Sequence, residues 1–256
     1  MSVSVFPIKA FNDNYIWCIH NKTHCTVVDP GDAAPVLAYC QDNQLTLSAI
    51  IITHHHWDHT GGIDALLATF PNILVYGPQN KNIKQITVRL SQGDDIELAQ
   101  LGVKFSILEV PGHTLDHIAY YGDIGLFCGD TLFSAGCGRL FEGTPQQMFT
   151  SLSKLTALPA DTAVFCTHEY TMANIAFAEA VEPNNQALID YKCWANQQRA
   201  ENTPTLPSNI QRELDVNPFL RCHSAELVVN VSQNMGAMLA SEQEVFASLR
   251  SWKDNF

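Results

Sequence analysis

The most constraining feature of the sequence is a polar tract that directly follows a short apolar run. The run Ala49–Ile52 has the length and composition of a buried β-strand. Residues 54–59 then read His-His-His-Trp-Asp-His, ahead of a Gly-Gly turn into a helical pattern. Alone, such a tract could be a solvated loop or a loose metal-scavenging segment. Its place at the end of a buried strand favours an organised metal site.

The same arrangement recurs at three later points in the chain. His113, Asp130 and His168 each come directly after another run of strand-like apolar residues. In α/β proteins, ligands gather outside the carboxyl ends of strands. Four strand ends that each offer a histidine or an aspartate therefore predict one shared metal-binding rim.

Spacing assigns the predicted ligands to two ions. Residues two apart in an extended segment project the same way, so His54 and His56 would bind one ion, and Asp58 with His59 a neighbouring one. The full predicted set is His54, His56 and His113 on the first ion, Asp58, His59 and His168 on the second, and Asp130 on both. Imidazoles and carboxylates without thiolates suit zinc foremost, with iron and manganese as alternatives, in an open catalytic site.

The remaining pattern predicts an α/β body followed by a helical tail. Short strand-like runs fill the first two-thirds of the chain, with helices expected at Gly62–Phe70 and from Pro145 to about Leu158. Five helices are expected after His168: Met172–Val181, Asn185–Ala200, Ser208–Leu214, Glu226–Gln233 and Glu242–Lys253. Capping boxes are expected at Thr144 and Ser241. We expect a catalytic domain over residues 1–168 and a helical subdomain over residues 169–256.

Charge and composition narrow the class of partner. The 26 acidic and 14 basic residues give a net charge of −12, which makes nucleic acid and anionic lipid poor partners. No apolar run reaches the length of a membrane helix, and the first residues lack an export signal. The eight cysteines form no C-x-x-C pair and suit a reducing compartment. We expect a cytoplasmic protein, and no surface pattern requires more than a monomer.

The ordered metal motif resembles that of the metallo-β-lactamase superfamily. Four further segments make the chain similar, over essentially its full length, to glyoxalase II, the hydroxyacylglutathione hydrolases: Asn-Asp-Asn-Tyr at 12–15, Gly-Cys-Gly-Arg at 136–139, His-Glu-Tyr-Thr at 168–171 and Arg-x-x-Lys at 250–253. The resemblance implies an αββα sandwich with a dinuclear site at one edge. It also implies that the small C-terminal helical subdomain helps to hold glutathione.

The resemblance further implies a reaction and a set of substrate contacts. The reaction is hydrolysis of S-D-lactoylglutathione and related 2-hydroxyacyl thioesters to glutathione and a 2-hydroxy acid, in methylglyoxal disposal. The water shared by the ions would attack the thioester carbonyl, and Asp58 would orient it as the catalytic residue. The glutathione contacts would be Arg139, Phe141, Tyr170, Arg250 and Lys253. Phe141 stands where some relatives have a tyrosine, so a hydroxyl contact is missing there.

Three rival functions and four ambiguous residues stay open at this point. Another hydrolase of the same fold, or a glutathione persulfide dioxygenase with one iron, would share the motif, although the complete second-ion set disfavours the dioxygenase. A non-enzymatic metal-binding or nucleic-acid-processing role would leave the helical tail unexplained, and the acidic charge opposes RNA. Asp116 either supports a ligand or is a surface turn residue, with the turn favoured. Asp29 either orients a ligand histidine or caps its turn. His55 is expected to be a non-ligand and His117 a structural histidine.

Overall fold

The computed structural model describes residues 2–256. Within these residues no helix is both long and apolar enough to cross a membrane. The chain forms two compact units. Unit 1 runs to Glu109 and resumes at Asp116–Gly129, and unit 2 consists of Val110–Leu115 and Asp130–Phe256.

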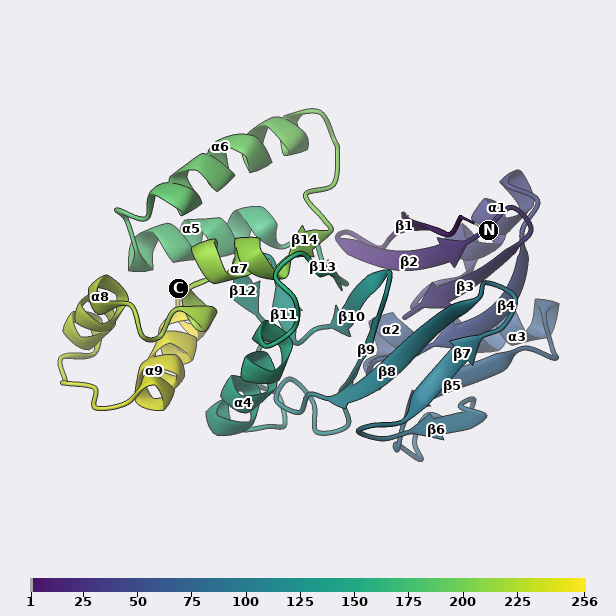
Figure 1. Cartoon of the computed structure of the whole chain (residues 1–256), viewed down its shortest axis with the longest axis horizontal. Coiled ribbons are helices and arrows are strands. Elements are labelled where there is room, and N and C mark those ends of the chain that lie inside the picture. Colours follow the sequence, from purple (N-terminus) through teal and green to yellow (C-terminus); the bar gives the residue numbers. More distant parts are fainter. Residues whose placement is uncertain (1) are drawn as a thin grey trace. The chain divides into compact units, whose positions relative to one another are not determined.

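A six-stranded mixed sheet forms the frame of unit 1 (Figure 1). Its strands, in spatial order, are β1 (Ser4–Ala10), β2 (Asn14–His20), β3 (His24–Val28), β4 (Thr46–Ile51), β5 (Leu74–Pro78) and β6 (Val88–Leu90). The first three pair antiparallel, and β3 to β6 pair parallel. The carboxyl ends of β3 and β4 therefore lie at the same edge of this sheet, where Asp29 and the histidine tract follow them.

Helices cover one face of this sheet. They are α1 (Ala33–Asp42), the single-turn α2 (Trp57–Thr60) and α3 (Ile63–Thr69). Val36 of α1 and Leu66 of α3 belong to the same buried cluster as Ile50 and Val75 of the sheet. Burial of this apolar surface holds the loop after β4 between a rigid strand and a packed helix.

The second sheet of unit 1 is antiparallel. It contains β7 (Asp95–Leu98), β8 (Val103–Glu109), β9 (Ile118–Gly122) and β10 (Gly125–Gly129). The Tyr120 hydroxyl donates to the Ile52 carbonyl at 2.8 Å, and the Ile118 amide donates to the Thr53 carbonyl at 2.9 Å. These two bonds fasten the end of β4 to β9.

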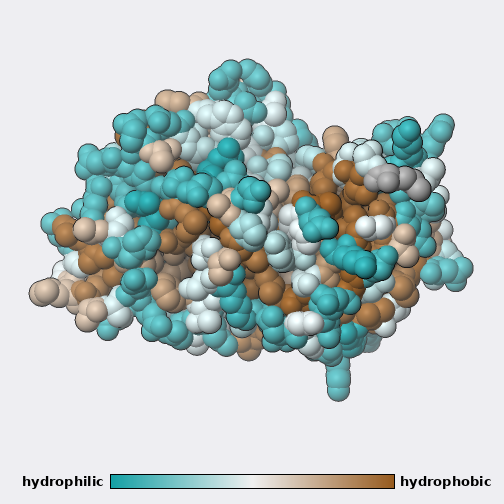
Figure 2. Space-filling view, in the orientation of Figure 1, coloured by the Kyte–Doolittle hydropathy of each residue, from teal (hydrophilic) through white to brown (hydrophobic). Residues whose placement is uncertain are grey.

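Unit 2 is mostly helical. Its strands are β11 (Leu132–Phe133), β12 (Gly136–Cys137), β13 (Ala163–Cys166) and β14 (Ser208–Asn209). Its helices are α4 (Pro145–Thr156), α5 (Thr171–Val181), α6 (Gln186–Ala200), α7 (Ile210–Val216), the 3-10 helix η1 (Pro218–Leu220), α8 (Ala225–Met235) and α9 (Glu242–Asp254). Hydrophobic residues reach the surface over α8, where Val229 and Met235 are exposed (Figure 2).

Several elements differ from the sequence-based expectation. Strand β1 was not among the expected strands; it contains Pro7 and is an edge strand, the position in a sheet where proline is tolerated. Helix α7 begins at Ile210, two residues late, because Ser208 and Asn209 pair with β13. The capping box at Thr144 is confirmed. At Ser241 only half of the box forms, since the Glu244 carboxylate accepts from the Ala240 amide.

A buried carboxylate ties α7 to the turn between β11 and β12. Glu213 accepts hydrogen bonds from the Ala135 amide at 2.8 Å and the Asn217 side chain at 3.0 Å. It also accepts from the hydroxyls of Ser134 and Ser208. Burial raises the pKa of Glu213, and these hydrogen bonds partly oppose that rise. The network stabilises the left-handed backbone of Ala135, whose φ is +54°.

We expect Glu213→Gln to lower the free energy of unfolding by about 1–3 kcal/mol, because an amide N–H would then face donors inside a buried network. Urea unfolding at pH 7 followed by circular dichroism measures the change. Gln211→Glu, on the exposed face of the same helix, is the matched control. An unfolding midpoint equal to that of the wild type would contradict the role given to this carboxylate.

Candidate metal centre and substrate site

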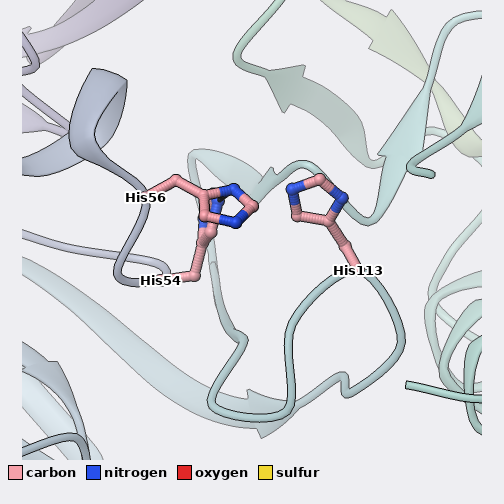
Figure 3. Close-up of side chains that lie close together, drawn as sticks. All are labelled: His54, His56 and His113. Carbon is pink, nitrogen blue, oxygen red and sulfur yellow. Dashed lines mark hydrogen bonds between the residues drawn. The ribbon is translucent and has the colours of Figure 1, made fainter. Parts of the chain in front are cut away.

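Unit 1 supplies one half of the predicted ligand set. His54 and His56 lie on the loop after β4, and the Nε2 of His54 is 3.1 Å from the Nδ1 of His56. Figure 3 draws these two rings on their loop; the third side chain that it labels, His113, belongs to unit 2 and comes from the loop after β8. Asp58 and His59 lie on α2, with 3.5 Å between Asp58 Oδ2 and His59 Nε2. The four predicted ligands of this unit are therefore grouped on one short segment.

A buried aspartate fixes the orientation of His59. Oδ2 of Asp29 lies 3.0 Å from Nδ1 of His59 and accepts from the Thr53 hydroxyl at 2.7 Å. Its Oδ1 accepts from the Thr53 amide at 2.7 Å. A carboxylate behind Nδ1 keeps the proton there and makes Nε2 the ligand atom. These contacts support both roles considered for Asp29: it orients His59, and its bond to the Thr53 amide caps the turn into the histidine tract.

Asp58 is held from two sides within unit 1. The buried Asn14, at the start of β2, donates from Nδ2 to Asp58 Oδ2 at 3.1 Å. Gly31 lies so close behind that a Cβ there would come within 1.9 Å of the Asp58 carbonyl oxygen. The amide bond sets the rotation of the carboxylate, and the close backbone approach sets its position. Asn14 belongs to the Asn-Asp-Asn-Tyr segment, but the sequence did not reveal this contact.

Unit 2 supplies the other half of the set. Oδ2 of Asp130 lies 3.4 Å from Nε2 of His113 and 3.3 Å from Nε2 of His168. Nδ1 of His113 donates to the Arg139 carbonyl at 2.7 Å, which again makes Nε2 the ligand atom. At Gly138, a Cβ would lie 1.9 Å from the Asp130 carbonyl oxygen. The Asp130 carboxylate therefore lies between two of the predicted ligand histidines.

Three of the predicted substrate contacts lie near the surface of unit 2. The ring of Tyr170 stacks on that of His168, with 4.7 Å between ring centres and 2° between ring planes. Phe141 is 62% exposed and meets the His113 ring edge-on at 5.3 Å. The guanidinium of the exposed Arg139 lies 5.9 Å from the centre of the Phe141 ring. His113 and His168 thus each have an exposed aromatic neighbour, Phe141 and Tyr170 respectively. The cation of Arg139 lies beside the Phe141 ring.

The two basic residues of α9 are more recessed. Arg250 is 5% exposed; it donates to the Cys137 carbonyl at 3.1 Å and to Asp254 at 2.9 Å. The Nζ of Lys253 donates to the Asn174 side-chain oxygen at 2.6 Å. Burial, aided by repulsion from Arg250, lowers the pKa of Lys253 to about 8. Both residues lie on one helix, as expected. Each of them already forms a hydrogen bond to another segment of unit 2, Arg250 to Cys137 and Lys253 to Asn174.

The neighbours of the ligands also have defined partners. Asp116 has a side chain only 13% exposed and binds His55, so it is more than a surface turn residue. His117 is buried, bonds the Ile118 carbonyl through Nδ1 and stacks on the His54 ring at 4.5 Å. His55 and His117 are not among the predicted metal ligands. His55 contacts Asp116, and His117 contacts the ligand His54.

The donor chemistry of the two half sets fits divalent ions. Every predicted ligand offers an imidazole nitrogen or a carboxylate oxygen, the donors typical of catalytic zinc, iron and manganese sites. In His59 and His113 an oxygen acceptor already holds Nδ1, so the ring presents the nitrogen that a metal needs. Within unit 1, ligand atoms of Asp29, His54 and His59 all lie within 4.8 Å of one another.

Comparison with known proteins identifies the family. Residues 11–168 match the model of the metallo-β-lactamase superfamily, and residues 169–256 match that of the hydroxyacylglutathione hydrolase C-terminus. The hydroxyacylglutathione hydrolase of Vibrio parahaemolyticus is 53% identical over 255 residues, which cover 99% of this chain and 100% of that protein. The chain belongs to the hydroxyacylglutathione hydrolase family. The enzyme of that name from Nitrosomonas eutropha is 49% identical over 254 residues, 99% of each chain.

Solved structures confirm the expected fold class of this family member. ETHE1 from Myxococcus xanthus superposes with a TM-score of 0.64 at 22% identity, covering 99% of this chain and 98% of its own. The BLEG-1 B3 metallo-β-lactamase gives 0.63 at 24% identity, covering 86% and 99%. The resemblance read from the sequence is confirmed, and the chain is a hydrolase of the metallo-β-lactamase fold with His/Asp groups suited to divalent metals.

We expect Asp29→Asn to weaken metal binding by about 10–100-fold, because both oxygens of Asp29 face hydrogen-bond donors and the amide would replace one of these acceptors with an N–H. Asparagine tolerates the left-handed backbone at this position, where φ is +51°, so the fold should persist. Metal content after dialysis against graded chelator measures the loss. Asp123→Asn, in the exposed turn between β9 and β10, is the control. Equal metal retention in both variants would rule the role out.

Proposed function

We propose that the protein hydrolyses the thioester of S-(2-hydroxyacyl)glutathiones, chiefly S-D-lactoylglutathione, to glutathione and a 2-hydroxy acid such as D-lactate. The proposal rests on one observation above all: about half of the residues are identical to hydroxyacylglutathione hydrolases over the full length of both chains. Such a reaction would consume the glutathione adducts formed in methylglyoxal disposal. A monomeric, cytoplasmic enzyme without nucleic-acid or membrane partners is part of the proposal.

The proposed cofactor is a pair of divalent ions, zinc foremost, with iron or manganese as alternatives. The residues that would hold them are His54, His56, Asp58, His59, His113, Asp130 and His168. When bound, the ions would lower the pKa of a shared water and polarise the thioester carbonyl. In support, each half set contains an aspartate beside at least one ligand histidine, and His59 and His113 are oriented by an oxygen behind the ring.

Asp58 is the proposed catalytic residue. Its carboxylate would accept a hydrogen bond from the attacking water and hold that water toward the carbonyl carbon of the substrate. The bond from Asn14 supports this role because it limits rotation of the carboxylate. The leaving group is a thiolate whose conjugate acid has a pKa of about 8.5, by analogy with cysteine. It can depart without protonation, so the mechanism needs no general acid.

The proposed glutathione contacts combine aromatic rings with cations. Phe141 and Tyr170 would pack against the tripeptide, and Arg139 and Lys253 would attract its carboxylates. Arg250 would add a second positive charge beside Lys253 on the same helix, although its side chain is only 5% exposed. On this proposal, residues 1–168 form the catalytic domain with every metal ligand. Residues 169–256 form the glutathione-binding subdomain.

The decisive experiment is to incubate the purified, metal-replete protein with S-D-lactoylglutathione and follow thioester loss with and without a chelator. We expect chelator-sensitive turnover, and a kcat roughly 100-fold or more lower in Asp58→Asn, because the water loses its acceptor. Oxygen uptake with glutathione persulfide and cleavage of a β-lactam test the rival functions. No thioester loss by the metal-replete wild type would overturn the proposal.

Lys253 gives a pH prediction. With its pKa near 8, Lys253 is charged below that pH and neutral above it. The KM for S-D-lactoylglutathione should therefore rise as the pH passes through 8, by roughly tenfold if one charge-assisted hydrogen bond is lost. Lys253→Arg keeps its charge, so its KM should stay flat over the same range. Parallel KM profiles for both proteins between pH 6 and pH 9 would count against the contact.

A further inference from the structure

A series of hydrogen-bonded side chains connects the loop after β5 to the loop after β4, which carries the predicted metal ligands His54 and His56. Oδ1 of Asp116 lies 2.8 Å from Nδ1 of His55. Its other oxygen, Oδ2, accepts from Nδ2 of Asn80 at 2.7 Å. Each carboxylate oxygen thus has its own partner, one on the loop after β4 and one on the loop after β5.

His55 occupies the centre of the proposed ligand segment. It stands between His54 and His56, whose ring nitrogens approach to 3.1 Å. The centre of the His55 ring lies 5.1 Å from that of the His56 ring, so a bond that holds His55 also restrains its immediate neighbours. Such a bond resists rotation of the whole segment about its own axis. It also engages one ring nitrogen of His55 away from any ion.

The far end of the chain is itself anchored. The Asn80 amide donates to the Pro78 carbonyl at 2.7 Å, and its side-chain oxygen accepts from the Asn82 amide at 2.9 Å. The Asn80 carbonyl accepts from the guanidinium of Arg89 on β6. The side chain of Asp116 is 13% exposed, so water competes little for these bonds. Asp116 therefore connects His55 to the edge of the six-stranded sheet.

We propose that Asp116 is a positioning residue for the first metal ion: by holding His55, it fixes the backbone that presents His54 and His56. This inference rests on the proposed metal site, although not on the substrate. Other side chains hold one ligand each: Thr53 Oγ1 lies 3.1 Å from Nδ1 of His54, and the Thr60 hydroxyl donates to the His56 carbonyl at 3.0 Å. Asp116 differs from them because it holds the residue between the two ligands. Asp116 acts on the backbone of both ligands through His55.

The test is a double-mutant cycle on metal affinity, which needs no substrate. Zinc and cobalt binding are measured by chelator competition, with the visible spectrum of the cobalt form reporting ligand geometry. We expect Asp116→Ala and His55→Ala each to weaken binding of one ion by about tenfold. The double variant should be no weaker than His55→Ala alone, since both changes break one chain of contacts. Asp116→Asn retains an oxygen for His55 and should recover most of the affinity.

Asp123→Ala, an exposed aspartate of the same unit, is the matched control. Additive losses in the cycle, or an Asp116→Ala affinity equal to that of the control, would overturn the inference. If Asp116→Ala does not fold, the cycle is run with Asp116→Ser, whose short side chain also loses the bond to His55 and for which the same non-additive loss is expected. Normal metal binding by the wild type without thioester turnover would contradict the proposed function and leave this inference unaffected.

Discussion

A buried imidazole that is to serve as a ligand must be held through its other nitrogen, and much of the surrounding structure depends on this requirement. An unpaired N–H inside a protein costs about 1–3 kcal/mol, so each ring needs an oxygen behind it. Asp29 supplies that oxygen for His59, and the Arg139 carbonyl supplies it for His113. Asp29 lies at the end of β3, and the parallel pairing of β3 with β4 brings it beside the histidine tract.

The two units orient their predicted ligands with different kinds of contact. Unit 1 orients its ligands with buried side chains, namely Asp29 behind His59 and Asn14 beside Asp58. Unit 2 relies on main-chain oxygen behind His113 and on stacked or edge-on aromatic rings beside His113 and His168. Both use a glycine at closest approach to the aspartate backbone. Rigidity around a metal site therefore comes from contacts that themselves bind no metal.

The sequence predicted those features that depend on local periodicity. Apolar runs followed by histidine or aspartate located the ligand candidates, and the pattern at Thr144 located the start of α4. It could not predict contacts between distant segments. Asn14 and Asp58 are 44 residues apart, and Arg250 reaches the Cys137 carbonyl across 113 residues. Helical spacing put Arg250 and Lys253 on one helix, but only the packed structure shows that both are recessed.

The close approach at Gly31 and Gly138 limits how the enzyme could be altered in the laboratory. Even a methyl group at either position would collide with the carbonyl of an aspartate, so random libraries would lose function there irrespective of the desired acyl group. Phe141 and Tyr170 are exposed and meet no such backbone collision, although Tyr170 also stacks on His168. On the proposed function, directed evolution toward bulkier thioesters would therefore start at Phe141, with the two glycines left invariant.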